Sequence, residues 1–114
     1  MQEFIKAMKA LSDETRLRIM NLLLERECCV CEVTQALDIS QSRASRNIGI
    51  LEGAGFLKAR REGAWMLYSI DQEAANRYAT SLLKLVKDYS AGNEVLEKDR
   101  RRLKRAVRIG PGCR

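Results

Sequence analysis

One feature limits the possible folds of this chain more than any other. It is a pair of short helical patterns separated by a three-residue break. Residues 32–37 carry apolar side chains at helical spacing, and Asp38-Ile39-Ser40 then interrupts the pattern. Ser40 suits the start of a second helix over residues 41–53, because its hydroxyl can accept a hydrogen bond from an early backbone N–H. Two short helices joined by a tight turn predict a helix-turn-helix. The inner face of the second helix is Ala44, Ile48 and Leu51.

The other face of the second helix is polar, as expected of a helix that enters the major groove of DNA. Glutamine and arginine side chains can make paired hydrogen bonds to adenine and guanine respectively. Arg43 is expected to contact a phosphate rather than a base. The residues predicted to reach base edges are Gln41, Ser42, Ser45 and Arg46.

A hairpin is predicted directly after this helix. Gly55 ends the helix, and residues 56–61 and 65–70 have the composition of two short strands. Glu62-Gly63 supplies the turn between them. A hairpin in this place is a wing, and a wing adds backbone contacts to DNA.

Three basic side chains of the wing are predicted to contact phosphates: Lys58, Arg60 and Arg61. Trp65 and Tyr68 are expected to pack inside the wing instead of stacking on bases.

Further helices are expected on both sides of this unit. One covers residues 4–10, a second is capped by Ser12 and ends near Arg26, and a third runs from a cap at Asp71 to about Ser90. The apolar band of the third is wide for a helix at the end of a small domain, which indicates a symmetric dimer interface. Its members are Ala75, Tyr78, Ala79, Leu82, Leu83, Leu85, Val86 and Tyr89.

Charge divides the chain into two parts. The net charge is +6, and residues 98–114 alone carry +7, so residues 1–97 carry −1. We therefore expect a domain over residues 1–92 for DNA binding and dimerisation, followed by a basic helix or tail over residues 93–114. The predicted class is mainly α with a small β-hairpin, and dimeric through the terminal helices.

Composition excludes several classes of function. No apolar run reaches the ~18 residues that a membrane span needs. The N-terminal residues lack the pattern of a secretion signal, which predicts a cytoplasmic protein. The chain has no histidine, so Ser42 and Ser45 have no imidazole to activate them and no enzyme is expected.

Cys28-Cys29-Val30-Cys31 places three thiols within four residues, just before the helix-turn-helix. In a reducing cytosol such thiols indicate metal binding or redox chemistry rather than structural disulfides. On an intact helix Cys28 and Cys31 would share a face while Cys29 would point elsewhere. Gathering all three requires a distorted helix or a cluster in the preceding loop. Cys113, near the C-terminus, is a rival third ligand.

Several segments together resemble the ArsR/SmtB family of winged-helix repressors. Ala10-Leu11-Ser12-Asp13-Glu14-Thr15-Arg16-Leu17-Arg18-Ile19 resembles the family's opening signature, and residues 37–48 resemble its helix-turn-helix. Residues 51–57 and Arg61-Glu62-Gly63 resemble the passage into its wing. The similarity covers about residues 4–90. A histidine is common in the family where this chain has Asn47.

The resemblance also implies an inducer. Residues 27–34 align with the family's arsenic-sensing box, in which Cys-Val-Cys is followed three residues later by another cysteine. Cys29 and Cys31 match that box, whereas Thr34 replaces the third cysteine. Trivalent arsenic takes three sulfur ligands, and thiolates are soft ligands that select soft ions. The predicted metalloid ligands are therefore Cys28, Cys29 and Cys31, with Cys113 as the alternative to Cys28.

The sequence therefore predicts a homodimeric repressor that binds operator DNA and is released by As(III) or Sb(III), with no permanently bound cofactor. Ligand binding would distort the first helix of the motif. One alternative is the same repressor driven by thiol oxidation, persulfide, cadmium or zinc. Another is a constitutive architectural DNA-binding protein that uses its basic tail.

Overall fold

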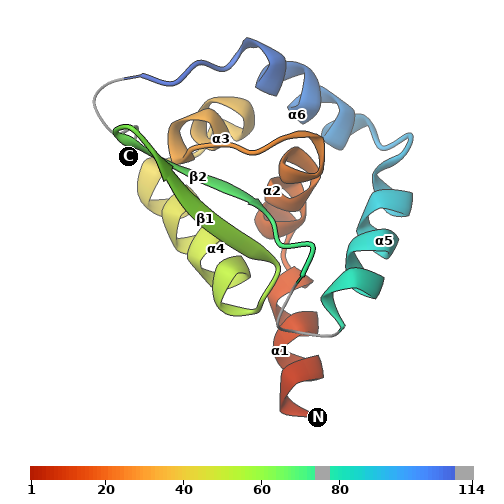
Figure 1. The fold of residues 1–114 in the computed structure, drawn as a ribbon. Coiled ribbons are helices and arrows are strands. Elements are labelled where there is room, and N and C mark those ends of the chain that lie inside the picture. The colour runs from red at the N-terminus through yellow and green to blue at the C-terminus, as the bar shows by residue number, and fades with distance from the viewer. Residues whose placement is uncertain (74–77, 110–114) are drawn as a thin grey trace.

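The computed structural model describes residues 1–73 and 78–109 of the chain. Its described part contains helices packed against one antiparallel β-hairpin (Figure 1), so the predicted class of a mainly α chain with a small hairpin is confirmed. The elements are α1 (Gln2–Leu11), α2 (Glu14–Glu25), α3 (Val30–Leu37), α4 (Gln41–Gly53), β1 (Leu57–Glu62), β2 (Trp65–Ile70), α5 (Ala79–Ser90) and α6 (Glu94–Arg105).

Helices α3 and α4 form the predicted helix-turn-helix. Asp38 adopts a left-handed conformation with φ of 56° and so ends α3. The Ser40 hydroxyl then accepts a hydrogen bond of 3.2 Å from the Arg43 N–H, as predicted for the helix cap. Helix α4 ends at Gly53, and Gly55, with φ of 90°, turns the chain toward the hairpin. The predicted bounds of this second helix are confirmed.

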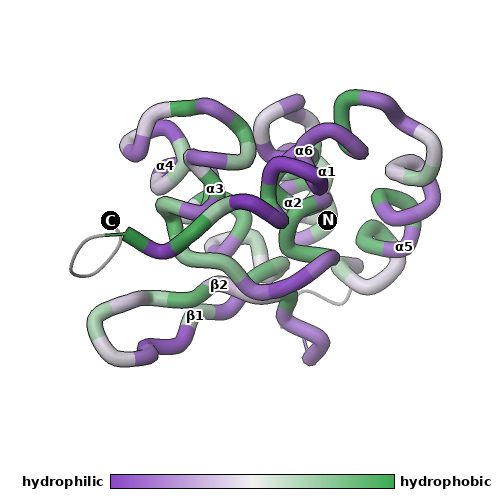
Figure 2. Tube along the Cα trace, turned by 90° about the horizontal axis from the view of Figure 1, so that it is seen from above, coloured by the Kyte–Doolittle hydropathy of each residue, from purple (hydrophilic) through white to green (hydrophobic). Residues whose placement is uncertain are grey.

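The hairpin is attached to the loop before α3. Its strands pair from Leu57 opposite Ile70 to Glu62 opposite Trp65, and Gly63, with φ of 60°, makes the turn. The backbone N–H of Cys28 donates to the Tyr68 carbonyl at 3.0 Å, and the Tyr68 N–H donates back at 2.8 Å. Seen from above, the hairpin runs along one side of the helices (Figure 2). The cysteine segment and the wing are therefore parts of one backbone network.

The core lies between α2, the helix-turn-helix and the base of the hairpin. Along the helices, hydrophobic and hydrophilic residues alternate (Figure 2), as expected of helices with one buried face. Burial of these apolar side chains removes them from water and is the main stabilising contribution to the fold. The largest fully buried apolar side chains are Phe56, Ile19, Met20, Leu22, Ile48, Leu51 and Leu67.

Four predicted helix starts are wrong, and the first is that of α1, which begins at Gln2 and not at residue 4. Asp13, and not Ser12, caps α2 by accepting the Arg16 N–H at 3.0 Å, while the Ser12 hydroxyl donates to the Met8 carbonyl of α1. Helix α3 starts at Val30, two residues before the predicted start. Asp71 does not begin a helix, because its backbone N–H donates to the Phe56 carbonyl and prolongs the end of the hairpin.

The predicted third helix is shorter than expected. Helix α5 begins at Ala79 and ends at Ser90, where its end was predicted. Ala75, which was expected on its apolar band, lies outside the described residues. Within the described band, Ala79 and Val86 are buried against the core, whereas Leu85 and Tyr89 are 64% and 61% exposed.

Helix α6 folds back over the top of the molecule and packs on α2 and α3 (Figure 1). Its Asp99 is 2% exposed and accepts two hydrogen bonds from the Arg18 guanidinium, at 2.7 and 2.9 Å. The Asn21 amide of α2 donates to the Leu96 carbonyl at 3.0 Å. A basic helix or tail was predicted here over residues 93–114, and α6 is anchored in the fold by these contacts. The division into residues 1–92 and 93–114 stays a prediction.

No helix in the described ranges is long and apolar enough to cross a membrane.

Candidate DNA interface and sulfur site

The outer face of α4 is open to solvent. All five residues predicted to contact DNA from this helix are exposed, and none lies on its buried face. Arg43 is also tied to the body of the protein, because its guanidinium donates to the Thr15 hydroxyl at 2.7 Å. The five residues are Gln41, Ser42, Arg43, Ser45 and Arg46.

Asn47 holds α4 in place, a role that sequence reasoning missed. It is 3% exposed, and its side-chain oxygen accepts a hydrogen bond of 2.9 Å from Arg16. Its amide nitrogen donates to the Arg43 carbonyl at 2.9 Å. Arg16 in turn donates to the Ala10 carbonyl at the end of α1 at 2.6 Å. The departure from histidine at this position was the only sequence signal for this network of α1, α2 and α4.

Replacement of Asn47 by alanine is expected to lower the free energy of unfolding by about 1–3 kcal/mol, because it removes a buried acceptor and leaves an Arg16 donor unpaired. Urea denaturation at a fixed protein concentration measures the change. Ser45→Ala on the exposed face of the same helix is the control, with an expected change within about 0.5 kcal/mol. Equal stability of the two variants would contradict the role assigned to Asn47.

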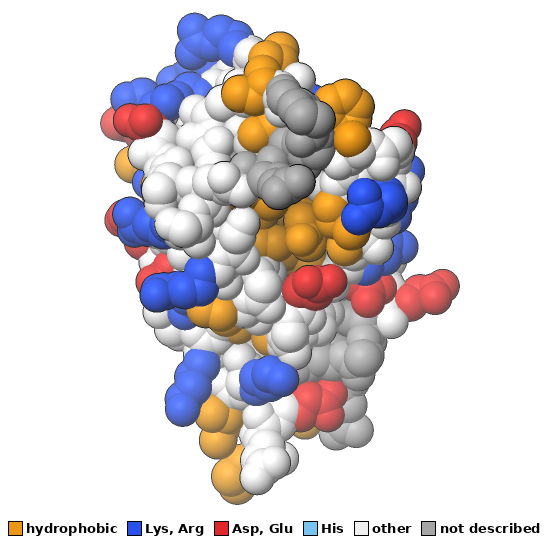
Figure 3. Space-filling model, turned by 90° about the vertical axis from the view of Figure 1, so that its left-hand side faces the viewer, with side chains coloured by type: hydrophobic (Ala, Val, Ile, Leu, Met, Phe, Trp, Pro, Cys, Tyr) orange, Lys and Arg blue, Asp and Glu red, His pale blue; other side chains and the backbone are white. Residues whose placement is uncertain are grey.

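The wing presents basic side chains with different surroundings. Lys58, Arg60 and Arg61 are all exposed. Arg60 is paired with Glu27 and, at 3.0 Å, with Glu62. This pairing raises the pKa of Arg60 and lowers the pKa of Glu27, chiefly through their hydrogen bond. Figure 3, which looks onto the side where the hairpin tip projects, shows basic side chains spread over this face. The guanidinium of Arg60 is therefore already engaged by two carboxylates.

Cys29 and Cys31 meet at the start of α3. Cys29 is the last residue before the helix and Cys31 lies in its first turn, and their Sγ atoms are 3.2 Å apart. Both residues are buried, at 0% and 5% exposure, and pack with Leu67 and Trp65 of the wing. Cys28 and Cys29 both precede the helix, so the intact helix on which Cys28 and Cys31 would share a face is not present, and the cluster begins in the preceding loop.

Cys28 faces another part of the protein. It is fully buried in the main core cluster, whereas Cys29 and Cys31 belong to a separate cluster. Its Sγ lies 3.5 Å from the Arg26 carbonyl, and burial raises the pKa of the thiol to about 12. Within residues 1–73 and 78–109, no three cysteine or acidic side chains are grouped so as to hold a metal ion. Cys113 lies outside the described residues.

Glu32 organises the start of α3. Its carboxylate is 4% exposed and accepts the Cys29 N–H at 2.9 Å, Arg26 at 2.8 Å and Arg108 at 3.3 Å. Burial favours the protonated form, but these three hydrogen bonds prevail and lower the pKa of Glu32. The carboxylate therefore ties the sulfur pair to the end of α2 and to the chain after α6.

The chain after α6 crosses α3 as a strap, which we define as residues 106–109 (Figure 1). The Gln35 side chain donates to the Val107 carbonyl at 2.6 Å and accepts the Val107 N–H at 3.0 Å. The Val107 carbonyl oxygen also lies 3.9 Å from the Cys31 Sγ. The strap thus passes directly beside the sulfur pair, an arrangement that no sequence pattern indicated.

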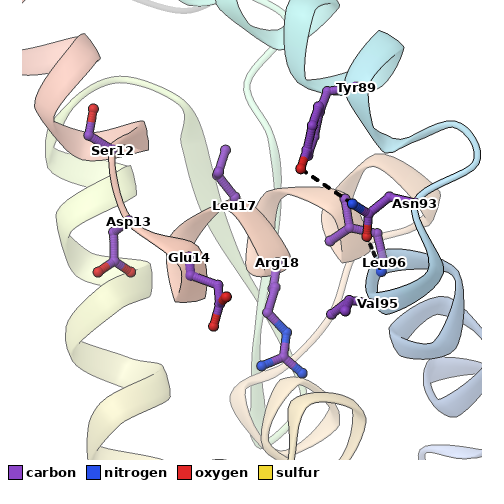
Figure 4. Close-up of a pocket in the computed structure, with 9 residues that line it drawn as sticks. All are labelled: Ser12, Asp13, Glu14, Leu17, Arg18, Tyr89, Asn93, Val95 and Leu96. Atoms are coloured by element: carbon purple, nitrogen blue, oxygen red, sulfur yellow. Dashed lines mark hydrogen bonds between the residues drawn. The ribbon is translucent and has the colours of Figure 1, made fainter.

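Two concavities lie on the other side of the molecule, where α2 and α5 meet. One, of about 420 Å³, is shown in Figure 4 with Arg18 and Tyr89 at its sides, and Tyr89 there accepts a hydrogen bond of 3.3 Å from Asn93. The neighbouring groove, of about 360 Å³, is mainly apolar. It is lined by Met8, Leu11, Ser12, Leu17, Leu82, Leu85, Val86 and Tyr89.

The helix-turn-helix, its exposed polar helix and the wing together define a winged-helix DNA-binding protein. Residues 13–59 match the family described as bacterial regulatory protein, arsR family. The arsenic resistance transcriptional regulator ArsR1 of Pseudomonas putida is 43% identical over 97 residues, which cover 83% of this chain and 73% of that protein. This chain belongs to the ArsR family of transcriptional regulators. The predicted resemblance is confirmed, and so is the prediction that the chain is not an enzyme.

Two further comparisons bear on inducer and assembly. A cadmium resistance regulator of Staphylococcus aureus, named a CadC homolog, is 44% identical over 69 residues, which cover 60% of this chain and 57% of that protein. A solved winged helix-turn-helix domain from Mycobacterium bovis, described as homodimeric and as a possible ArsR-family regulator, has a TM-score of 0.67 and 30% identity. That alignment covers 78% of this chain and 79% of the solved chain.

Proposed function

We propose that this chain is a cytoplasmic, homodimeric repressor that binds operator DNA and is released when As(III) or Sb(III) binds its cysteines. The observation that carries the proposal is the Cys29–Cys31 sulfur pair, with Sγ atoms 3.2 Å apart at the first turn of the helix that supports α4. Adjacent sulfurs are suited to a soft, thiophilic ion. The similarity to an arsenic resistance regulator supports the same inducer.

The proposed DNA contacts are divided between bases and phosphates. Gln41, Ser42, Ser45 and Arg46 would read base edges from the open face of α4, and Arg43 and the wing would contact the backbone. In a symmetric dimer the two reading helices lie about one turn of DNA apart, so the operator is expected to be an inverted repeat.

Replacement of Arg46 by alanine should weaken specific binding by about 1–3 kcal/mol and relax the base preference at one position of each half-site. Replacement of Lys58 by alanine should weaken binding to all sequences alike and lower the salt slope by about 1. Fluorescence anisotropy at several salt concentrations, with specific and scrambled duplexes, separates the two effects. If both variants lose affinity equally on both duplexes, Arg46 contacts phosphate instead of a base.

A second copy of this chain is the proposed occupant of the apolar surface formed by α1 and α5. Phe4 and Met8 of α1 are each 42% exposed, and Leu85 and Tyr89 of α5 are more exposed still. The homodimeric description of the similar Mycobacterium bovis domain supports this assignment. Leu85→Glu would place a charge in that interface and should convert the protein to monomers with weaker DNA binding. Sedimentation velocity measures this, and Lys84→Glu on the same helix is the control.

The mechanism would pass from the sulfur pair to DNA through α3. Cys29 and Cys31 belong to the beginning of α3, and α3 packs on α4. Bonds from both sulfurs to one ion would change the geometry of that first turn. A coupling of about 1–3 kcal/mol is typical of such linkage, so arsenite should weaken operator binding by about 5- to 150-fold.

The test uses the wild-type protein and a duplex selected by the ligand-free protein from a random DNA pool. Anisotropy of the complex is followed during titration with arsenite, antimonite, Cd²⁺, Zn²⁺ and hydrogen peroxide. Release by arsenite and antimonite supports the proposal. Release of the DNA only by Cd²⁺ or Zn²⁺, or only by peroxide, would identify one of the alternative inducers. It would overturn the proposal of a trivalent arsenic or antimony inducer. A complex that none of these agents disturbs would indicate a constitutive architectural protein.

A further inference from the structure

One side of helix α6 carries basic and acidic side chains together. Arg100 and Lys104 line a shallow concavity that also contains Glu25 and Glu97. The Arg100 guanidinium lies 3.7 Å from the Glu25 carboxylate and donates to the Asn21 side-chain oxygen at 2.5 Å. The positive charge on this side of α6 is therefore offset in part by carboxylates of the protein itself.

The opposite side of α6 has basic side chains without acidic neighbours. Arg102 and Arg105 are three residues apart, so they share a helical face, and together with Gln35 and Ala106 they line a concavity of about 200 Å³. Arg102 donates to the Gln35 carbonyl at 3.0 Å. Arg105 is exposed, and no hydrogen bond or ion pair joins it to another residue within the ranges 1–73 and 78–109. We call Arg102 and Arg105 the α6 basic face.

The α6 basic face adjoins the start of the helix that is predicted to read DNA. Gln35 lies two residues before the end of α3 at Leu37, and α4 begins at Gln41. Six residues span at most about 22 Å when fully extended. The connection is shorter than that, because the Ile39 N–H donates to the Thr34 carbonyl and turns the chain back on α3. In Figure 1 the chain leaves α6 toward the side where α4 begins.

Duplex DNA places phosphates beside a helix that lies in its major groove. That groove is about 12 Å wide and has a phosphate backbone along each border, so side chains close to the start of the helix are near one of these backbones. An arginine guanidinium can donate two parallel hydrogen bonds to phosphate oxygens. The charge of this chain is complementary to such a backbone, since residues 1–97 carry −1 while residues 98–109 include seven basic residues and one acidic residue.

We propose that the α6 basic face is a third DNA-contacting surface, in addition to α4 and the wing, and that Arg102 and Arg105 bind phosphates beside the bases that α4 reads. The hydrogen bond from Arg102 to Gln35 fixes the end of α6 relative to the helix-turn-helix, so the two guanidinium groups are positioned before DNA arrives. Contacts to phosphates carry no sequence information, and the surface adds affinity and not base preference. The inference rests on the DNA binding of the proposed function and is independent of its inducer.

The salt dependence of DNA binding tests this contact. Each phosphate contact contributes about 0.9 to the slope of log K against log salt concentration. Arg105→Gln should lower the slope by about 0.9 for each bound subunit and weaken binding by roughly 5-fold per subunit near 0.15 M salt, on specific and scrambled duplexes alike. Arg105→Lys keeps the charge and should keep most of the slope. Lys104→Gln, which is exposed on the opposite side of the same helix, is the matched control and should bind as the wild type does.

Phosphate substitution locates the contact on the duplex. Each phosphate of the operator is replaced in turn by an uncharged methylphosphonate, and the affinity is measured by fluorescence anisotropy. The wild type should lose affinity at the phosphates contacted by α4, by the wing and by α6. Arg105→Gln should become insensitive to substitution at one position of each half-site, and Lys58→Ala at a different position. If the two variants lose sensitivity at the same phosphate, α6 does not form a separate surface and the inference is overturned.

The outcomes also separate this inference from the proposed function. A wild type that binds no duplex would overturn both. If the wild type binds DNA and Arg105→Gln has an unchanged salt slope, only the inference is overturned. Equal losses in Arg105→Gln and Lys104→Gln would reflect the overall charge of α6 and would overturn it too. An unchanged slope together with weaker binding of Arg105→Gln to phosphatidylglycerol vesicles would assign the surface to lipid headgroups instead of DNA.

Discussion

Replacement of either Cys29 or Cys31 by serine should abolish the release of DNA by arsenite while leaving DNA binding without inducer nearly unchanged. The two sulfurs lie together at the start of α3, away from the exposed face of α4. Serine oxygen is a hard ligand and a poor replacement for a thiolate on a soft ion. The wild-type complex should weaken by about 5- to 150-fold with arsenite, and the variant complexes by less than 2-fold.

Trp65 provides a second measurement of the same variants. It is the only tryptophan of the chain and packs against the cluster of Cys29, Cys31 and Leu67. Arsenite should therefore change the Trp65 fluorescence in the wild type and in Cys28→Ser, but not in Cys29→Ser or Cys31→Ser. An arsenite-induced change of emission that persists in Cys29→Ser and Cys31→Ser would place the inducer elsewhere.

Replacement of Asp99 by alanine is expected to lower the free energy of unfolding by about 3 kcal/mol. Its carboxylate is nearly inaccessible to water and accepts both Arg18 hydrogen bonds. Removal of one partner of a buried ion pair leaves the other charge without compensation, which costs about 3–5 kcal/mol. The lower end of this range applies here because the Arg18 side chain is 22% exposed to solvent.

Urea denaturation at constant protein concentration measures this loss, with Lys98→Ala as the control. Lys98 is the exposed neighbour of Asp99 on α6, so its replacement should change the stability by less than about 0.5 kcal/mol. Similar stabilities of the two variants would mean that α6 contributes little to the fold. A large difference would show that the basic C-terminal helix is part of the folded body.

Local signals allowed part of this fold to be predicted. The bounds of α4 follow from the Ser40 cap and the left-handed Gly55, and the hairpin follows from a turn containing Gly63, all of which act within a few residues. The start of α5 was missed because an aspartate at position 71 suits a helix cap, whereas its backbone N–H donates to the Phe56 carbonyl at the end of the hairpin.

The candidate site was predicted only in part, because its organisation depends on residues that are distant in sequence. The cluster at residues 28–31 is visible in the sequence, but its division between two packing clusters depends on side-chain directions at a helix start. Gln35 meets Val107 across 72 positions, and Arg18 meets Asp99 across 81. No periodicity or motif connects such partners, so the strap and the anchoring of α6 required the three-dimensional structure.

The two hydrogen bonds from the Gln35 side chain to the Val107 backbone bear on which substitutions the protein can accept during evolution. Because the amide group contacts only the carbonyl and N–H of Val107, almost any residue except proline can occupy that position without losing the contact. The sequence after the strap can then vary while the position of the strap on α3 stays the same. The residue at this position can therefore change without loss of the contact that holds the strap to α3.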